Sequence, residues 1–188
     1  IKKLQVEDGD CVMEIGPGGG MHLPLLLEKA NNIVYKGVDI SSTMVALAQA
    51  NNSMLMQHKD ANFIQVILEN GFVKFPCDEN SFDSIFTVNT IYFWDNATEQ
   101  ALEIARVLKP EGTLLLCFAD KTFMQKMPFT QYNFHLYTID EATELLVRSG
   151  FEIESVGSEL ENITGIHGEK FDREIHFIAA KKRSATNR

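Results

Sequence analysis

The sequence predicts an α/β fold: a mostly parallel, seven-stranded sheet with helices on both faces and an antiparallel hairpin at its C-terminal end. Short apolar runs alternate along the chain with helical patterns, which is typical of such three-layer folds. The first apolar run ends in a glycine-rich turn that leads into a helical pattern. The last two apolar runs have no helical pattern between them, so we expect them to pair in opposite directions.

Apolar runs and apolar spacing place the individual elements. Strands are expected at residues 12–15, 33–38, 63–68, 82–88, 113–118, 151–156 and 173–180. Helices are expected at residues 21–30, from 41–43 to about 50, from 96–98 to 108, and at 138–150. Residues 181–188 read as a polar, basic tail, so residues 1–180 are expected to form one domain.

Local signals justify the elements of the first half. Pro24 is tolerated because it falls in the first turn of its helix, where its missing N–H costs nothing. The second strand ends in the acid Asp39, and a serine or threonine just after it can cap the next helix. The pair Asn51-Asn52 weakens that helix, so its end stays unassigned.

The second half has clearer stop signals. The stretch between the third and fourth strands is too short for a full crossover helix, yet an extended chain of that length can cross two intervening strands. Pro110 ends the next helix. Thr138 and Glu141 form a capping box at the start of the last helix, and Gly150 closes it.

Composition limits the class of protein. The chain has 188 residues, 45% hydrophobic and 23% charged, which suits a single soluble domain with a core. The formal net charge of −9 argues against a nucleic-acid partner and an anionic membrane. No apolar run approaches the roughly 20 residues that span a bilayer. Because the first residue is Ile1 and not Met, we expect the chain to begin inside a longer natural one.

Cysteine usage points to a reducing compartment. Cys11, Cys77 and Cys117 lie in apolar stretches without CxxC spacing, so we expect buried, reduced thiols. Together with the lack of a signal peptide, this predicts a cytoplasmic protein without disulfides. No cluster of His, Cys and carboxylate residues has metal-ligand spacing, so no metal is expected.

The turn at residues 16–20 is the candidate ligand site. Gly16, Gly18 and Gly20 let the backbone turn sharply and let a ligand approach where a Cβ would collide. The following helix points its first N–H groups at that ligand. A second strand that ends in an acid, Asp39, completes the pattern expected for a nucleotide-like cofactor.

Four features resemble the class I S-adenosylmethionine-dependent methyltransferases, especially those that act on small molecules. They are the loop at residues 14–20 (EIGPGGG), Asp39, the approach to the fourth strand at 76–83 (PCDENSFD) and the entry to the fifth at 106–112 (RVLKPEG). The resemblance covers almost the whole chain and implies a Rossmann-like fold. It implies transfer of a methyl group from S-adenosylmethionine, with S-adenosylhomocysteine as product.

The resemblance also implies roles for individual residues. Gly16, Gly18 and Gly20 would let the main chain touch the methionine portion of the cofactor. Glu14 would lie near its ammonium group, and the backbone carbonyl of Asn89 would meet the same group.

On the nucleoside side, Asp39 would accept hydrogen bonds from the ribose hydroxyls, and Ile40 would pack on the adenine ring. The family usually has an aspartate after the third strand that reads the adenine amino group. This sequence departs from that pattern, and the candidates are Asn70, Gly71 through its backbone N–H, or Glu69 if the alignment slips by one.

The acceptor side is expected to be aromatic. Residues 89–94 (NTIYFW) would face the transferable methyl group, and a second aromatic stretch at 123–137 is long enough to be a lid over the acceptor. The alternative is that these aromatics simply cover the sheet edge. A general base is needed only if the acceptor must lose a proton, and the candidates are Tyr92, His135 and His22.

Two alternatives to a methyltransferase stay open at this stage. A nicotinamide-dependent oxidoreductase shares the glycine turn and Asp39, but not the helix-free stretch before the fourth strand or the terminal hairpin. A non-enzymatic cofactor-binding or partner-binding protein shares every feature, because fold does not fix function. The acceptor and the oligomeric state are not determined by the sequence.

Overall fold

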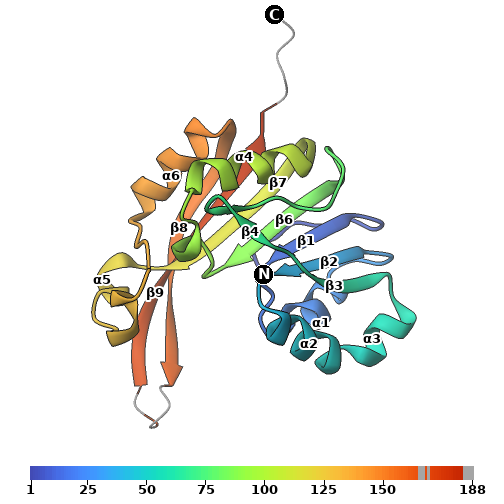
Figure 1. Cartoon of the computed structure of the whole chain (residues 1–188), viewed down its shortest axis with the longest axis horizontal. Coiled ribbons are helices and arrows are strands. Elements are labelled where there is room, and N and C mark those ends of the chain that lie inside the picture. Colours follow the sequence, from blue (N-terminus) through green and yellow to red (C-terminus); the bar gives the residue numbers. More distant parts are fainter. Residues whose placement is uncertain (165–167, 169, 184–188) are drawn as a thin grey trace, which may run out of the picture.

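The computed structural model describes residues 1–164, 168 and 170–183. Its main sheet has the strand order β3-β2-β1-β6-β7-β9-β8 (Figure 1). These strands are β1 (Cys11–Ile15), β2 (Val34–Asp39), β3 (Ala61–Gln65), β6 (Phe82–Val88), β7 (Leu108–Ala119), β8 (Phe151–Thr164) and β9 (Lys170–Lys182). The strands from β3 to β7 pair in parallel, whereas β9 runs antiparallel to both β7 and β8. The predicted sheet and terminal hairpin are confirmed.

Helices cover both faces of this sheet (Figure 1). One layer holds α1 (His22–Leu27), α2 (Ser42–Asn51) and α3 (Ser53–His58), and the other holds α4 (Ala97–Val107) and α6 (Ile139–Arg148). Alternation along β1 shows why two cores form. Val12 packs into a core with Leu23 and Leu26 of α1, while Met13 packs into a core with residues of α4 and α6. The three-layer fold is therefore as predicted.

The connection from β3 to β6 passes β2 and β1 without a helix, as expected. It carries a small hairpin instead, made of β4 (Leu68–Glu69) and β5 (Phe72–Val73). Asn70 and Gly71 form its two-residue turn, with φ angles of 52° and 80°. Both values are positive, as the tight turn of an Asn-Gly hairpin requires.

Two boundaries and one additional helix in the first half differ from the prediction. The first helix ends at Leu27, three residues before the predicted end at residue 30. The chain has left the helix by Asn31, whose backbone N donates to the Oδ1 of Asp8 at 2.8 Å. The third strand ends at Gln65; of the apolar residues that follow it, Val66 and Leu68 line a cavity, whereas Ile67 is exposed. The extra helix α3 was not predicted.

The terminal hairpin is longer than predicted. Its outer part is exposed and mostly polar, so the sequence shows no alternation of apolar and polar residues that would predict a strand there. Cross-strand pairs hold it, including Glu161 with Arg173 at 2.6 Å. Lys181 and Lys182 belong to β9, so the tail predicted for residues 181–188 is wrong at these two positions, and residues 184–188 lie outside the described part of the chain. In the described ranges, no helix combines the length and apolar character needed to cross a membrane.

Candidate cofactor and acceptor site

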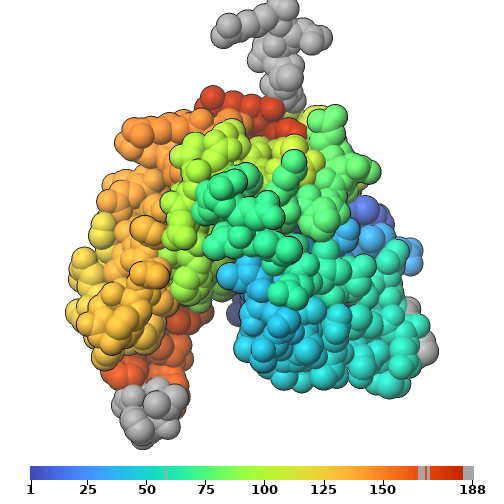
Figure 2. Space-filling model, viewed as in Figure 1, coloured from blue at the N-terminus to red at the C-terminus, as the bar shows by residue number. Residues whose placement is uncertain are grey.

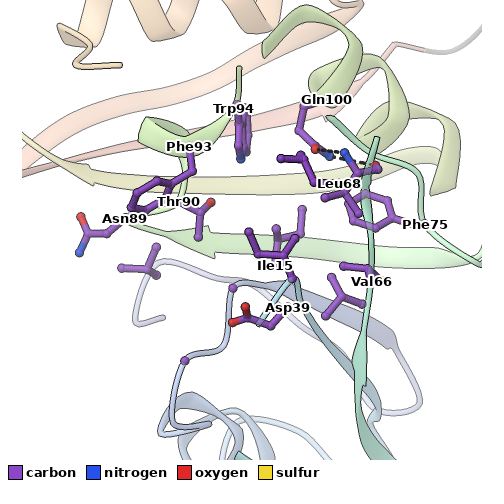
Figure 3. Close-up of a pocket in the computed structure, with 16 residues that line it drawn as sticks. Ile15, Asp39, Val66, Leu68, Phe75, Asn89, Thr90, Phe93, Trp94 and Gln100 are labelled. Carbon is purple, nitrogen blue, oxygen red and sulfur yellow. Dashed lines mark hydrogen bonds between the residues drawn. The ribbon is translucent and has the colours of Figure 1, made fainter. Parts of the chain in front are cut away.

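A cavity of about 360 Å³ lies at the carboxyl ends of β1, β2 and β6 (Figure 3). This is where the strand order reverses, the usual place for ligands in such sheets. Most of its lining is apolar. The lining residues are Ile15, Gly16, Gly18, Val38, Asp39, Ile40, Val66, Leu68, Val73, Phe75, Val88, Asn89, Thr90, Phe93, Trp94 and Gln100.

The glycine loop forms one side of this cavity. Gly16 and Gly18 line it, and Gly16 has a φ of 69°. A Cβ on Gly16 would collide with the Cγ2 of Thr90, which packs directly against the loop. Residue 16 therefore must be glycine both for its backbone conformation and for the close approach of the loop to β6.

Two asparagines at the end of α2 hold the loop in place. The Nδ2 of Asn52 donates to the Gly20 carbonyl at 3.0 Å and to the Ala48 carbonyl at 2.9 Å. The Nδ2 of Asn51 donates to the Gly19 carbonyl at 2.9 Å. The pair that weakens the helix in sequence terms thus fixes the glycine loop, a role that sequence reasoning missed although adjacent asparagines at a helix end were visible.

Asp39 ends β2 at the rim of the cavity. Its Oδ1 accepts a hydrogen bond from the backbone N of Ser41 at 2.9 Å, and Ser41 in turn caps α2. Within the described part of the chain, no donor contacts the Oδ2 of Asp39. One carboxylate oxygen therefore serves the local turn, and the other is available to a ligand.

Glu14 lies on the opposite side of β1 from Ile15, the cavity-lining residue that follows it. Its carboxylate is buried, bonded to the Nδ1 of His22 at 2.6 Å and accepting from the hydroxyl of Tyr35 at 2.5 Å. Burial, followed by the charge of Glu14, raises the pKa of Tyr35 well above its usual value, so Tyr35 stays the donor. Neither Glu14 nor His22 is among the cavity-lining residues.

The structure does not bring Asn70 or Gly71 to the cavity. The Gly71 carbonyl accepts from the backbone N of Asn96 at 2.7 Å, which ties the hairpin turn to the start of α4. From this connection, Val66 and Leu68 line the cavity instead. A reading of the adenine amino group by Asn70 or Gly71 stays a prediction.

Side chains of α4 hold the part of the cavity wall formed by β5 and the residues just after it. Gln100 is buried and accepts from the backbone N of Val73 at 2.8 Å. One turn later, Glu103 accepts from the backbone N of Phe75 at 2.8 Å and from Arg106 at 2.7 Å. Because both wall residues line the cavity, α4 acts here as a substitute for a neighbouring strand.

Asn89 follows β6 with a φ of 58°. Its side chain bends toward the end of β7, where its Oδ1 accepts from the backbone N of Ala119 and from the Tyr92 hydroxyl, both at 3.2 Å. Tyr92 itself is buried under this contact, and burial raises its pKa to about 12. Tyr92 therefore remains protonated at neutral pH and fastens the turn after β6.

His135 is exposed and lies 3.3 Å from Asp95 through its Nε2, outside the cavity lining. Of the three candidate bases, the structure places none in the cavity. In the described segments, no group of three His, Cys, Asp or Glu side chains is arranged to hold a metal ion.

The aromatic stretch after β7 approaches the cavity through Phe93. This stretch contains α5 (Lys121–Met124) and the short helix η2 (Pro128–Gln131). The Phe93 ring lies 4.8 Å from the Phe134 ring, which lies 5.6 Å from the Phe129 ring. Figure 2 shows the surface hollowed between the gold atoms of this stretch and the cyan atoms around α2. The site is thus an apolar cavity with a polar loop on one side and an aromatic surface on the other.

Comparison with known proteins gives one family. A family model described as a methyltransferase domain matches residues 13–116. The uncharacterized methyltransferase YdaC of Bacillus subtilis is 29% identical over 112 residues, covering 60% of this chain and 58% of that protein. A demethylmenaquinone methyltransferase of Tropheryma whipplei is 32% identical over 116 residues, covering 62% of this chain and 44% of that protein.

The chain covers less than two thirds of the length of these curated relatives. Among solved structures, a SAM-dependent methyltransferase from Aquifex aeolicus has a TM-score of 0.71 and 21% identity, covering 96% of this chain and 86% of that one. This similarity shows the fold, including its C-terminal antiparallel strands.

Proposed function

The chain belongs to the methyltransferase-domain family, and we propose that it transfers a methyl group from S-adenosylmethionine to a small-molecule acceptor. One observation carries the proposal: a single cavity joins the glycine loop, the available carboxylate oxygen of Asp39 and the aromatic turn after β6. These three parts correspond to the amino-acid end of the cofactor, its ribose and the acceptor.

The chemistry of the cavity fits this cofactor. Asp39 offers an acceptor to ribose hydroxyls, and the apolar walls around Ile40 and Val66 suit a flat adenine ring. The glycine loop offers main chain without intervening side chains. When bound, the cofactor supplies an activated methyl group on a sulfonium, so the chain's own contribution is to hold the acceptor in line and to exclude water. Proximity and orientation of this kind can supply about 7–11 kcal/mol of acceleration.

Calorimetry with S-adenosylmethionine, S-adenosylhomocysteine and NAD tests the cofactor. We expect binding of the first two and none of NAD; a preference for NAD would support an oxidoreductase instead. Gly16→Ala should abolish binding, because the added Cβ meets Thr90. Gly9→Ala is the matched control, since Gly9 also has a positive φ, 88°, but no neighbouring atom within 4 Å.

An acceptor screen that follows release of S-adenosylhomocysteine tests transfer. Turnover with any small acceptor supports the proposal. Tight cofactor binding without transfer to a broad panel would instead indicate a binding protein that kept the fold. Protease sensitivity of the 123–137 stretch should fall when cofactor and acceptor are both bound, and unchanged cleavage would contradict its role as a lid.

A further inference from the structure

Thr90 lines the cavity (Figure 3), and the single hydrogen of its hydroxyl is already used within the protein. The Oγ1 of Thr87 donates to the Ile15 carbonyl at 3.0 Å, and because a carbonyl only accepts, this bond consumes the single hydroxyl hydrogen of Thr87. Thr87 and Thr90 are also hydrogen-bonded through their hydroxyls. Thr90 must therefore be the donor in that pair.

It follows that Thr90 can only accept from a ligand. A hydroxyl has one hydrogen and two lone pairs, and the hydrogen of Thr90 points at Thr87. Thr87 is fully buried in β6, so this direction is not open to competition from water. Thr90 itself lines the cavity next to Gly16. The cavity therefore presents a fixed hydrogen-bond acceptor at the carboxyl end of β6.

An aromatic surface starts next to this acceptor. Phe93 lines the cavity, yet the residue is 48% exposed, so its ring forms part of the rim (Figure 3). The contacts of Phe93 with Phe134, and of Phe134 with Phe129, continue the aromatic surface away from the cavity. Phe129 is 51% exposed. We call these three rings the aromatic rim.

We propose, on the basis of the proposed function, that the acceptor is a flat, apolar ring compound that carries an O–H or N–H group. The ring lies against the aromatic rim, where offset or edge-to-face contacts favour planar molecules. The O–H or N–H donates to the Oγ1 of Thr90, which holds the attacking atom near the cofactor. In the transfer, the bond from the methyl carbon to the attacking oxygen or nitrogen forms as its bond to sulfur breaks, and the hydrogen of the attacking atom leaves as a proton to water. An acceptor with a single such hydrogen gives a product that lacks this bond and is released more readily.

Calorimetry with the chain saturated with S-adenosylhomocysteine tests this assignment. The probes are a naphthol, its methyl ether of the same ring isomer, and the corresponding decahydronaphthol, which has the hydroxyl but no flat ring. For the unmodified chain, we expect the naphthol to bind about fivefold more tightly than its ether, the effect of one neutral hydrogen bond. The decahydronaphthol should bind more weakly than the naphthol.

Variants separate the two parts of the proposal. Thr90→Val removes the oxygen and should abolish the preference for naphthol over ether, whereas Thr90→Ser keeps the oxygen and should retain it. Phe129→Ala should weaken both naphthalenes alike. Phe171→Ala, at a half-exposed phenylalanine of β9, should change neither.

Three results would overturn the proposal: no binding of either naphthalene, equal affinities in the unmodified chain, or a preference that survives Thr90→Val. Binding of S-adenosylhomocysteine is measured in the same samples before the probes are added. If the nucleoside itself does not bind, the proposed function has failed; if it binds and the probes behave otherwise than expected, only the acceptor assignment has failed.

Discussion

The substitution Asp39→Asn separates the structural contact of the Asp39 carboxylate from its proposed contact with the cofactor. Its Oδ1 holds the backbone N of Ser41, and its Oδ2 is available to a ligand. Asparagine can keep the first contact with its amide oxygen, but it places an NH₂ group where Oδ2 was. A ribose hydroxyl then loses its charged acceptor while the start of α2 keeps its support. Cofactor affinity should fall with little loss of stability.

The size of the loss follows from the kind of hydrogen bond removed. A hydrogen bond to a charged group contributes about 1.5–3 kcal/mol, and a tenfold change in affinity corresponds to about 1.4 kcal/mol. Asp39 is partly exposed, so solvent screening favours the lower end of this range. We therefore expect the Kd for S-adenosylhomocysteine to rise about tenfold.

Calorimetry with two ligands checks that the ribose is the partner. The second ligand is the analogue of S-adenosylhomocysteine that lacks both ribose hydroxyls. The unmodified chain should bind this analogue about tenfold more weakly, and Asp39→Asn should bind the two ligands almost equally. The matched control is Glu154→Gln, which makes the same change of charge at an exposed residue paired with Lys181 on the far edge of the sheet.

The reasoning is refuted if Asp39→Asn binds S-adenosylhomocysteine as tightly as the unmodified chain does. It is also refuted if the variant still discriminates tenfold between the two ligands, because the hydroxyls would then have another partner. If Asp39→Asn and Glu154→Gln weaken the binding of S-adenosylhomocysteine equally, the effect is explained by the change of net charge alone.

Three further predictions concern the supports of the site. Glu103→Gln should lower the free energy of unfolding in urea by about 2–3 kcal/mol, because it discharges the buried partner of Arg106. Gly20→Ala should lower both the unfolding midpoint and cofactor affinity, since its Cβ would lie 2.5 Å from the Nδ2 of Asn52. Tyr92→Phe should reduce the loss of folding stability at high pH. Because the pKa of Tyr92 is raised to about 12 in the folded chain, its neutral hydroxyl favours the fold below about pH 10, and this contribution to stability is lost as the pH rises from there through 12.

Each of these predictions has a matched control. Glu99→Gln changes an exposed acid of the same helix, and a similar effect there would contradict the role of Glu103. Gly150→Ala adds a Cβ at a φ of 91° with no atom within 4 Å, so it measures backbone strain alone. Tyr132→Phe removes an exposed hydroxyl, and urea unfolding at rising pH should show no change from it. An unchanged alkaline slope in Tyr92→Phe would refute that prediction.

Signals that act locally made the fold predictable. The capping box of Thr138 with Glu141 and the positive φ of Gly150 fix the last helix through bonds within a few residues. The parallel strands are buried on both faces and therefore read as apolar runs. The outer part of the hairpin had no such signal, because cross-strand ion pairs hold it and their partners lie far apart in sequence.

The site was predictable where the chain's own backbone makes it. The glycine loop and Asp39 lie in the cavity because strand ends in a parallel sheet meet at one edge. The surrounding supports depend on pairings that no local pattern encodes. Asn52 reaches the glycine loop from another helix, and the hairpin turn at Asn70 faces α4. Whether a residue supports the loop or lines the cavity depends on the direction of its side chain in the folded chain, which its position in the sequence does not reveal.

The two halves of the site meet at β1 and β6, and one short network sets their spacing. Thr87 ties β6 to the Ile15 carbonyl of β1 and also receives the hydrogen of Thr90. The methyl group of Thr90 occupies the space that a side chain at Gly16 would need. Gly16 of the glycine loop and Thr90, the residue that we propose binds the acceptor, are therefore in direct contact. Because a substitution that enlarges one of them must displace the other, we expect changes at either position to alter both cofactor affinity and acceptor preference.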